Sequence, residues 1–135
     1  MESHGIKTRA KIFQSVSSYS WDSFAHFKRS EFACRCGCGF DDEDLKVVEI
    51  LEIIRKHFGG RPVIVTSGCR CVKHNNKVGG IKGSMHLYGK ACDFYIKGVS
   101  TQNLLNYCYG LMNQGLIKYT YTNNKNMRGV VHINI

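Results

Sequence analysis

Two histidines and one aspartate in the second half of the chain have the residue types of a catalytic metal site. His86 and Asp93 lie seven residues apart within residues 84–93, and His132 lies near the end of the sequence. Neutral imidazoles and an ionised carboxylate supply the nitrogen and oxygen donors that Zn²⁺ binds, and a catalytic zinc keeps a further position open for water. We therefore predict one catalytic Zn²⁺ at these three residues, which makes the chain a candidate metallohydrolase.

The three residues can meet only if the chain places them on one side of a sheet. In the predicted strand 91–96, alternation puts Asp93 on the face opposite a cysteine and two apolar side chains. In the predicted strand 129–135, His132 likewise lies opposite three apolar residues. His86 comes from the loop before the first strand, so the donors converge if the two strands are neighbours. Taken singly, each residue has an ordinary structural explanation, and only the combination favours a metal.

The remaining elements follow from apolar periodicity and from helix and turn signals. We expect a helix over 42–58, a strand over 62–67, a loop over 68–90 with one helical turn near 72–77, a helix from Ser100 to about Asn113, a strand over 117–122 and a turn over 123–128. This order predicts an α+β domain: an antiparallel sheet of about four strands carries a zinc cleft, and helices pack on its other face. Residues 1–25 are predicted to be an N-terminal arm, and 26–135 the domain.

Composition narrows the classes of protein that fit. A chain of 135 residues is long enough for one domain with a real core, and it has no apolar run long enough to span a membrane. The first ten residues lack the apolar segment of a secretory signal, so we expect synthesis in the cytoplasm.

The net charge of +9 indicates an anionic partner, either nucleic acid or an acidic bacterial wall. The charges form no Lys/Arg block, which weakens the nucleic-acid alternative. No pattern fixes the oligomeric state, and a monomer is favoured.

Seven cysteines are an unusual and odd number for this length. Five of them lie in two tight clusters, Cys34, Cys36 and Cys38, and Cys69 and Cys71. Two alternatives stay open: a second, structural ion at these five residues, or a disulfide between the clusters that forms after release from the cell. A zinc-stabilised nucleic-acid binder is a weaker third alternative, because C-x-C is tighter than the usual finger spacing. Cys92 and Cys108 lie in apolar surroundings and are predicted to be buried thiols.

The segments around the candidate ligands resemble the M15 family of zinc peptidases. These are D-alanyl-D-alanine carboxypeptidases and related murein endopeptidases, including bacteriophage endolysin domains. The resemblance runs from about residue 26 to the C-terminus and includes a late Val-His pair at 131–132. It is carried by Ser67-Gly68-Cys69-Arg70, by His74-Asn75-Asn76-Lys77-Val78-Gly79-Gly80 and by Ser84-Met85-His86-Leu87-Tyr88-Gly89-Lys90-Ala91-Cys92-Asp93.

The resemblance implies roles for individual residues. It implies the same three zinc ligands, within the hedgehog-like and DD-peptidase-like fold of the family. Arg70 matches an arginine that faces the substrate, where a guanidinium can stabilise a developing oxyanion. Ser84 matches a serine near the substrate. Asn134 stands where one branch of the family carries an aspartate that can act as general base, and an amide cannot accept a proton.

The function that follows is zinc-dependent hydrolysis of a peptidoglycan bond next to a D-amino acid, either as a D-Ala-D-Ala carboxypeptidase or as a stem or cross-link endopeptidase. The alternative is a catalytically impaired, zinc-bearing cell-wall-binding module of the same fold, suggested by Asn134. Bacterial peptidoglycan is the expected partner, and nucleic acid is not. We expect action at the bacterial wall, reached through phage lysis or delivery with a virion.

Overall fold

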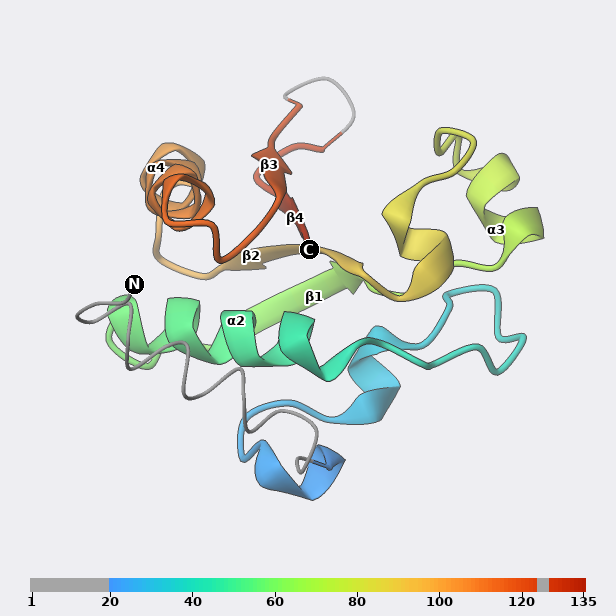
Figure 1. Ribbon diagram of the computed structural model, residues 1–135, viewed down its shortest axis with the longest axis horizontal. Coiled ribbons are helices and arrows are strands. Elements are labelled where there is room, and N and C mark those ends of the chain that lie inside the picture. Colours follow the sequence, from blue (N-terminus) through green and yellow to red (C-terminus); the bar gives the residue numbers. More distant parts are fainter. Residues whose placement is uncertain (1–19, 124–126) are drawn as a thin grey trace.

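The structure, a computed structural model, describes residues 20–123 and 127–135. Its centre is a four-stranded antiparallel sheet in the order β1-β2-β4-β3 (Figure 1). The strands are β1 (Val63–Ser67), β2 (Ala91–Ile96), β3 (Tyr119–Tyr121) and β4 (Val131–Asn134). The helices are α2 (Leu45–His57), α3 (Val72–Lys77) and α4 (Thr101–Asn113), with short 3-10 helices η2 (Trp21–Ser23), η3 (Arg29–Phe32) and η4 (Met85–Tyr88). The predicted α+β class with an antiparallel sheet of about four strands is confirmed.

Local signals explain where the two longest helices begin. The Asp44 side chain accepts a hydrogen bond from the backbone of Lys46, and the Ser100 side chain accepts one from Asn103. Both residues are N-caps, because their side chains satisfy donors that the first helical turn leaves free. The first helix was predicted from residue 42 onward, but its cap is Asp44, so the preceding acidic residues lie outside it.

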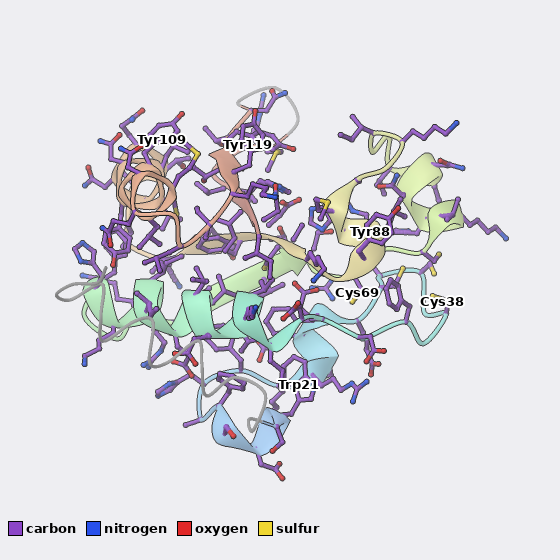
Figure 2. The ribbon with its side chains drawn as sticks, viewed as in Figure 1. Trp21, Cys38, Cys69, Tyr88, Tyr109 and Tyr119 are labelled. Atoms are coloured by element: carbon purple, nitrogen blue, oxygen red, sulfur yellow. The ribbon has the colours of Figure 1, made fainter. Side chains whose placement is uncertain are left out.

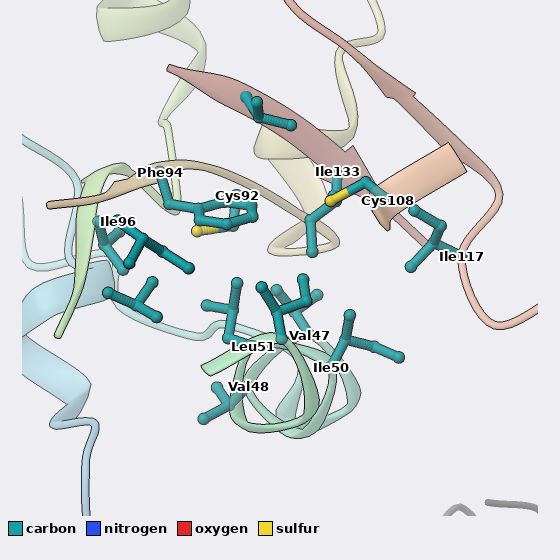
Figure 3. Packing of buried hydrophobic residues seen from close by; sticks show 14 of the residues in the cluster. Val47, Val48, Ile50, Leu51, Cys92, Phe94, Ile96, Cys108, Ile117 and Ile133 are labelled. Atoms are coloured by element: carbon teal, nitrogen blue, oxygen red, sulfur yellow. The ribbon is translucent and has the colours of Figure 1, made fainter. Parts of the chain in front are cut away.

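Apolar side chains from α2, α4 and one face of the sheet form the core. Figure 3 shows Cys92, Phe94 and Ile133 of the sheet facing Val47 and Leu51 of α2. The strand residues on this face alternate with those that carry the candidate site, as the period of two requires. The other members of the core include Phe24, Phe27, Phe32, Val48, Ile50, Ile54, Val63, Val65, Ile96, Leu104, Leu105, Cys108, Leu111, Ile117 and Val131.

Several predicted boundaries differ from the observed ones. β3 covers 119–121 rather than 117–122, and β4 covers 131–134 rather than 129–135. Gly129 has a φ of 72°, a left-handed conformation that a strand does not contain. Part of the turn predicted over 123–128, and residues 1–19 of the predicted N-terminal arm, lie outside the described residues. The division at 25/26 stays a prediction, although Phe24, on its N-terminal side, packs into the core.

None of the described helices combines the length and the apolar character that a bilayer crossing requires.

Candidate metal centre

Strand register brings two of the predicted ligands together. β2 and β4 are direct neighbours, and Asp93 pairs with His132 across them. The third residue, His86, lies in η4. A backbone hydrogen bond holds η4 against the segment after β1, because Arg70 N–H donates to the His86 carbonyl at 3.0 Å. One donor atom from each of the three residues lies within 4.8 Å of the others. The sequence-predicted trio therefore converges in space: η4 and β2 bring His86 and Asp93, and β4 brings His132 from a distant part of the chain.

Both imidazoles are oriented by hydrogen bonds that point away from the centre. His86 Nδ1–H donates to the Gly68 carbonyl at 2.7 Å, and His132 Nε2–H donates to Asn134 Oδ1 at 2.8 Å. The other ring nitrogens, His86 Nε2 and His132 Nδ1, lie 3.2 and 2.8 Å from the same carboxylate oxygen, Asp93 Oδ1. A histidine that binds a metal commonly donates its second ring N–H to an outer acceptor, which fixes the tautomer. Because one nitrogen of each ring faces the centre while the other donates outward, the two histidines and Asp93 fit a Zn²⁺ ion.

The three side chains of this centre are buried, and their surroundings shift the pKa of the carboxyl group. His86, Asp93 and His132 are only 2%, 7% and 5% exposed. Burial raises the pKa of Asp93, but the neighbouring rings of His132 and His86 outweigh this effect and hold that pKa well below its usual range. The carboxylate is therefore ionised at neutral pH, as a metal ligand must be.

Arg70 lies beside the centre and is held in place by three partners. Its Nη2–H donates to Asp93 Oδ2 at 3.2 Å, while Nε–H donates to Ser67 Oγ at 3.0 Å and Nη1–H to Asn75 Oδ1 at 3.1 Å. A guanidinium has five N–H donors, so two of them are not used by these three partners among the described residues and can bind a ligand. The predicted substrate-facing arginine thus adjoins the predicted ligands through Asp93.

Close packing around Arg70 explains a glycine in the loop after α3. A Cβ atom on Gly80 would lie 2.9 Å from Arg70 Nη1 and closer still to the Asn75 side chain. Asn75 also donates to the Ile81 carbonyl at 3.0 Å, so it links this loop to Arg70. A side chain at Gly80 would therefore displace Asn75, the partner of Arg70.

The two other predicted site residues have structural contacts. Ser84 is the N-cap of η4, and its Oγ accepts from the backbone N–H of His86 at 3.3 Å. Asn134 is buried, and its side-chain oxygen is occupied by the hydrogen bond from His132. Ser84 therefore helps to fix the segment that carries His86, and Asn134 fixes the ring of His132.

Sequence reasoning missed Tyr121. This residue is the cross-strand partner of His132, and the two rings lie 4.7 Å apart between centroids with 35° between their planes. Burial raises the pKa of the Tyr121 phenol, and the nearby Asp93 carboxylate adds to the rise. Alternation within the strand predicted over 117–122 could have indicated this residue. However, the face that alternation gives to Tyr121 lies at the site only because β3 pairs with β4.

Four cysteines form a second group of potential donors. One sulfur each from Cys34, Cys36, Cys38 and Cys71 lies within 4.8 Å of the others. The fifth predicted member, Cys69, does not belong to this group, because its buried thiol donates to Glu43 Oε1 at 3.5 Å. The proposed five-residue set is therefore corrected to four, and all seven cysteines are free thiols in the structure.

Comparison with known proteins identifies the family. The family model described as Peptidase M15 matches residues 25–134. The chain belongs to the M15 peptidase family. The predicted resemblance is confirmed, and the matched range contains both histidines, Asp93, Arg70 and Asn134. A search of curated proteins finds no match for this M15 peptidase.

Membership of the M15 family implies a class of reaction. M15 proteins are metallopeptidases and typically depend on zinc, so this M15 peptidase is a hydrolase of the metallopeptidase class. The group of His86, Asp93 and His132 can hold one metal ion, and the group of four cysteines can hold another.

Proposed function

We propose that this M15 peptidase is a zinc-dependent peptidoglycan peptidase that hydrolyses a bond next to a D-amino acid. The observation that carries the proposal is the single carboxylate oxygen, Asp93 Oδ1, on which one nitrogen from each of His86 and His132 converges, in a chain of a peptidase family. Three protein donors leave a coordination position for water or substrate, which is the arrangement of a catalytic zinc site.

His86 Nε2, His132 Nδ1 and an Asp93 oxygen would hold the Zn²⁺ ion. When bound, the ion supplies Lewis-acid polarisation of a carbonyl oxygen. The two N–H groups of Arg70 that remain after its bonds to Ser67, Asn75 and Asp93 would bind the substrate carbonyl or a terminal carboxylate. Because the guanidinium is already fixed, little side-chain entropy is lost when it binds.

The chemistry of the substrate accords with the charge of the chain. A net charge of +9 favours approach to an acidic bacterial wall. Action at the bacterial wall, with delivery by phage lysis or by a virion, belongs to the same proposal, as do a monomeric state and a domain that spans 26–135.

A second candidate function rests on Asn134. Its side-chain oxygen accepts the hydrogen bond of His132, and an amide cannot take a proton from water. The protein would then be a zinc-bearing wall-binding module with impaired catalysis. An Asn134→Asp variant distinguishes the candidates: peptide release by this variant alone supports the impaired module, and release by the unaltered protein contradicts it.

The test of the leading proposal is mass spectrometry of purified peptidoglycan after incubation with the zinc-loaded protein, beside a chelated sample. Release of D-Ala would identify a carboxypeptidase, and release of stem or cross-link fragments would identify an endopeptidase. If no peptide is released, or if the chelator leaves the release unchanged, the proposal is contradicted.

A further inference from the structure

Three of the four clustered cysteine sulfurs have the spacing expected in a metal tetrathiolate, and the fourth lies close to them. The sulfur of Cys34 lies 3.4 Å from that of Cys36 and 3.9 Å from that of Cys71, and the sulfurs of Cys36 and Cys71 lie 3.6 Å apart. A disulfide needs about 2.05 Å between sulfurs. A tetrahedron with Zn–S bonds of about 2.3 Å has sulfurs about 3.8 Å apart along its edges. The distances among these three sulfurs therefore match the edges of a tetrahedral zinc site and do not match a disulfide, and Cys38 Sγ lies within 4.8 Å of all three.

Two segments far apart in the sequence build this cluster. Cys34, Cys36 and Cys38 lie on the loop before α2, where Gly37 has a φ of 82° and its N–H donates to the Cys34 carbonyl at 3.1 Å. The fourth sulfur comes from Cys71, the N-cap of α3. Figure 2 shows Cys38 on this loop close to α3. The tight C-x-C-x-C spacing is thus completed by a distant residue, which is why it resembles no finger motif.

Backbone donors already point at two of the sulfurs. The N–H of Cys71 donates to Cys34 Sγ at 3.4 Å, and the N–H of His74 donates to Cys71 Sγ at 3.4 Å. Hydrogen bonds from outer groups to ligand atoms orient the ligands of a metal and stabilise their negative charge. By contrast, Cys69 has a carboxyl group as its neighbour, and burial together with Glu43 raises the pKa of its thiol. Cys69 is therefore suited to remain a thiol.

We propose that Cys34, Cys36, Cys38 and Cys71 hold a second, structural Zn²⁺ ion as a tetrathiolate. Four protein ligands close the coordination sphere, so this ion has no position for substrate and acts on structure. Binding replaces the thiol protons with the ion, and the displaced protons go to solvent.

The ion would fix the part of the chain that carries Arg70. Cys71 follows Arg70 directly, and Arg70 N–H donates to the carbonyl of His86. The segment is also held on its other side, because Cys69 N–H donates to the Phe32 carbonyl at 2.8 Å. A zinc at the four sulfurs would therefore join the loop before α2 to the residues beside the peptidase centre. This consequence rests on the proposed function, whereas the site itself does not.

The experiment is cobalt substitution of the full chain, in the unaltered protein and in a His86→Ala/His132→Ala variant that removes the first centre. Thiolate-bound Co²⁺ gives an intense sulfur-to-metal charge-transfer absorption, which nitrogen and oxygen ligands do not give. We expect two ions per chain in the unaltered protein and one in the histidine variant, both with this absorption. A Cys36→Ser/Cys38→Ser variant should lose it, and Cys108→Ala, which removes a core thiol outside the cluster, should keep it.

A measurement on the unaltered protein covers the case of a variant that fails to fold. Cys36 and Cys38 are exposed, so an alkylating reagent reaches them freely when no ion is bound. Zinc should slow their alkylation at least roughly tenfold, because a metal-bound thiolate must dissociate before it reacts. The proposal is overturned if the cobalt protein lacks the thiolate absorption, or if zinc leaves the alkylation rates of Cys36 and Cys38 unchanged. Neither readout depends on peptidase activity, so failure of the proposed function leaves this test intact.

Discussion

The two groups of candidate metal ligands in this protein differ in the number of side chains, in the donor atoms and in the secondary structure that carries them. His86, Asp93 and His132 offer nitrogen and oxygen, are buried, and come from the central strands and η4. The four cysteines offer sulfur, two of them are exposed, and they come from a loop and a helix start. The paired strands and the hydrogen bonds to Gly68 and Asn134 hold the first group, whereas backbone hydrogen bonds of a loop and of a helix start hold the second. Three protein ligands leave a position open for catalysis, whereas four close the coordination sphere and suit a structural ion.

Asp93→Asn should have the largest effect and should separate the two groups. The change removes the charge on which both imidazoles converge, and we expect peptidase activity to fall by roughly 10³-fold or more. Mass spectrometry of released peptide measures the loss. The matched control is Asp42→Asn, at a highly exposed carboxylate that pairs with Arg29. Equal activity in the Asp93 variant and the control would refute the assignment of the first group as the catalytic centre.

Arg70→Lys should have the next largest effect. Lysine keeps the charge but cannot bridge Ser67, Asn75 and Asp93 and still present donors to a substrate, so we expect kcat/KM to fall by about 10²-fold. Metal content should not change, which elemental analysis of both proteins checks. Arg29→Lys, at a surface pair, is the control. A loss of zinc from the Arg70 variant would mean that this residue acts on the metal site and not on the substrate.

Asn134→Leu should weaken the first group without touching the second. The variant removes the acceptor that orients His132, and loss of such an outer partner costs about 10-fold to 100-fold in metal affinity. Asn134→Asp, which keeps an acceptor, should not lose affinity. Competition with a chelator measures the first site, and the cobalt–thiolate absorption reports the second. If the leucine variant binds metal as tightly as the unaltered protein, the orienting role of Asn134 is wrong.

Glu43→Gln should have the smallest effect and concerns a carboxyl group that belongs to neither centre. Burial raises the pKa of Glu43 to about 9, with smaller opposing and supporting effects from Cys69, Asp44 and Asp93. The folded state therefore keeps a proton that the unfolded state releases above its ordinary pKa, so stability falls as pH rises between the two values. Between pH 6 and pH 8 the unaltered protein should lose about 2 kcal/mol more than the variant.

Urea unfolding at the two pH values measures this difference, with Asp22→Asn, at an exposed carboxylate, as the control. A parallel pH dependence in the unaltered protein and the glutamine variant would contradict the buried, protonated state of Glu43.

Local patterns in the sequence were sufficient for much of the fold and for the faces of the strands on which Asp93 and His132 lie; that these residues bind a metal stays a prediction. Alternation in the strands 91–96 and 129–135 placed Asp93 and His132 on the face opposite the core, and the helix predicted from Ser100 begins there, with Ser100 as its N-cap. These features depend on neighbouring residues, so one sequence contains them.

Features that depend on pairing between distant segments could not be predicted. Tyr121 lies beside His132 only because of the register between β3 and β4, and Cys69 is separated from its neighbour Cys71 only because it faces Glu43. The role of Asn134 had the same limitation: its type suggested a missing base, and the hydrogen bond to His132 became visible only with the side chains in place.

The central claim is that the histidine–aspartate group, and not the cysteine group, is the peptidase centre. The most direct test is peptide release from purified peptidoglycan by chelated protein before and after zinc is restored, in the unaltered chain and in the His86→Ala/His132→Ala variant. We predict that zinc restores release only in the unaltered chain, while the variant still binds one ion at its thiols. Release by the histidine variant, or release by fully chelated protein, would contradict the account.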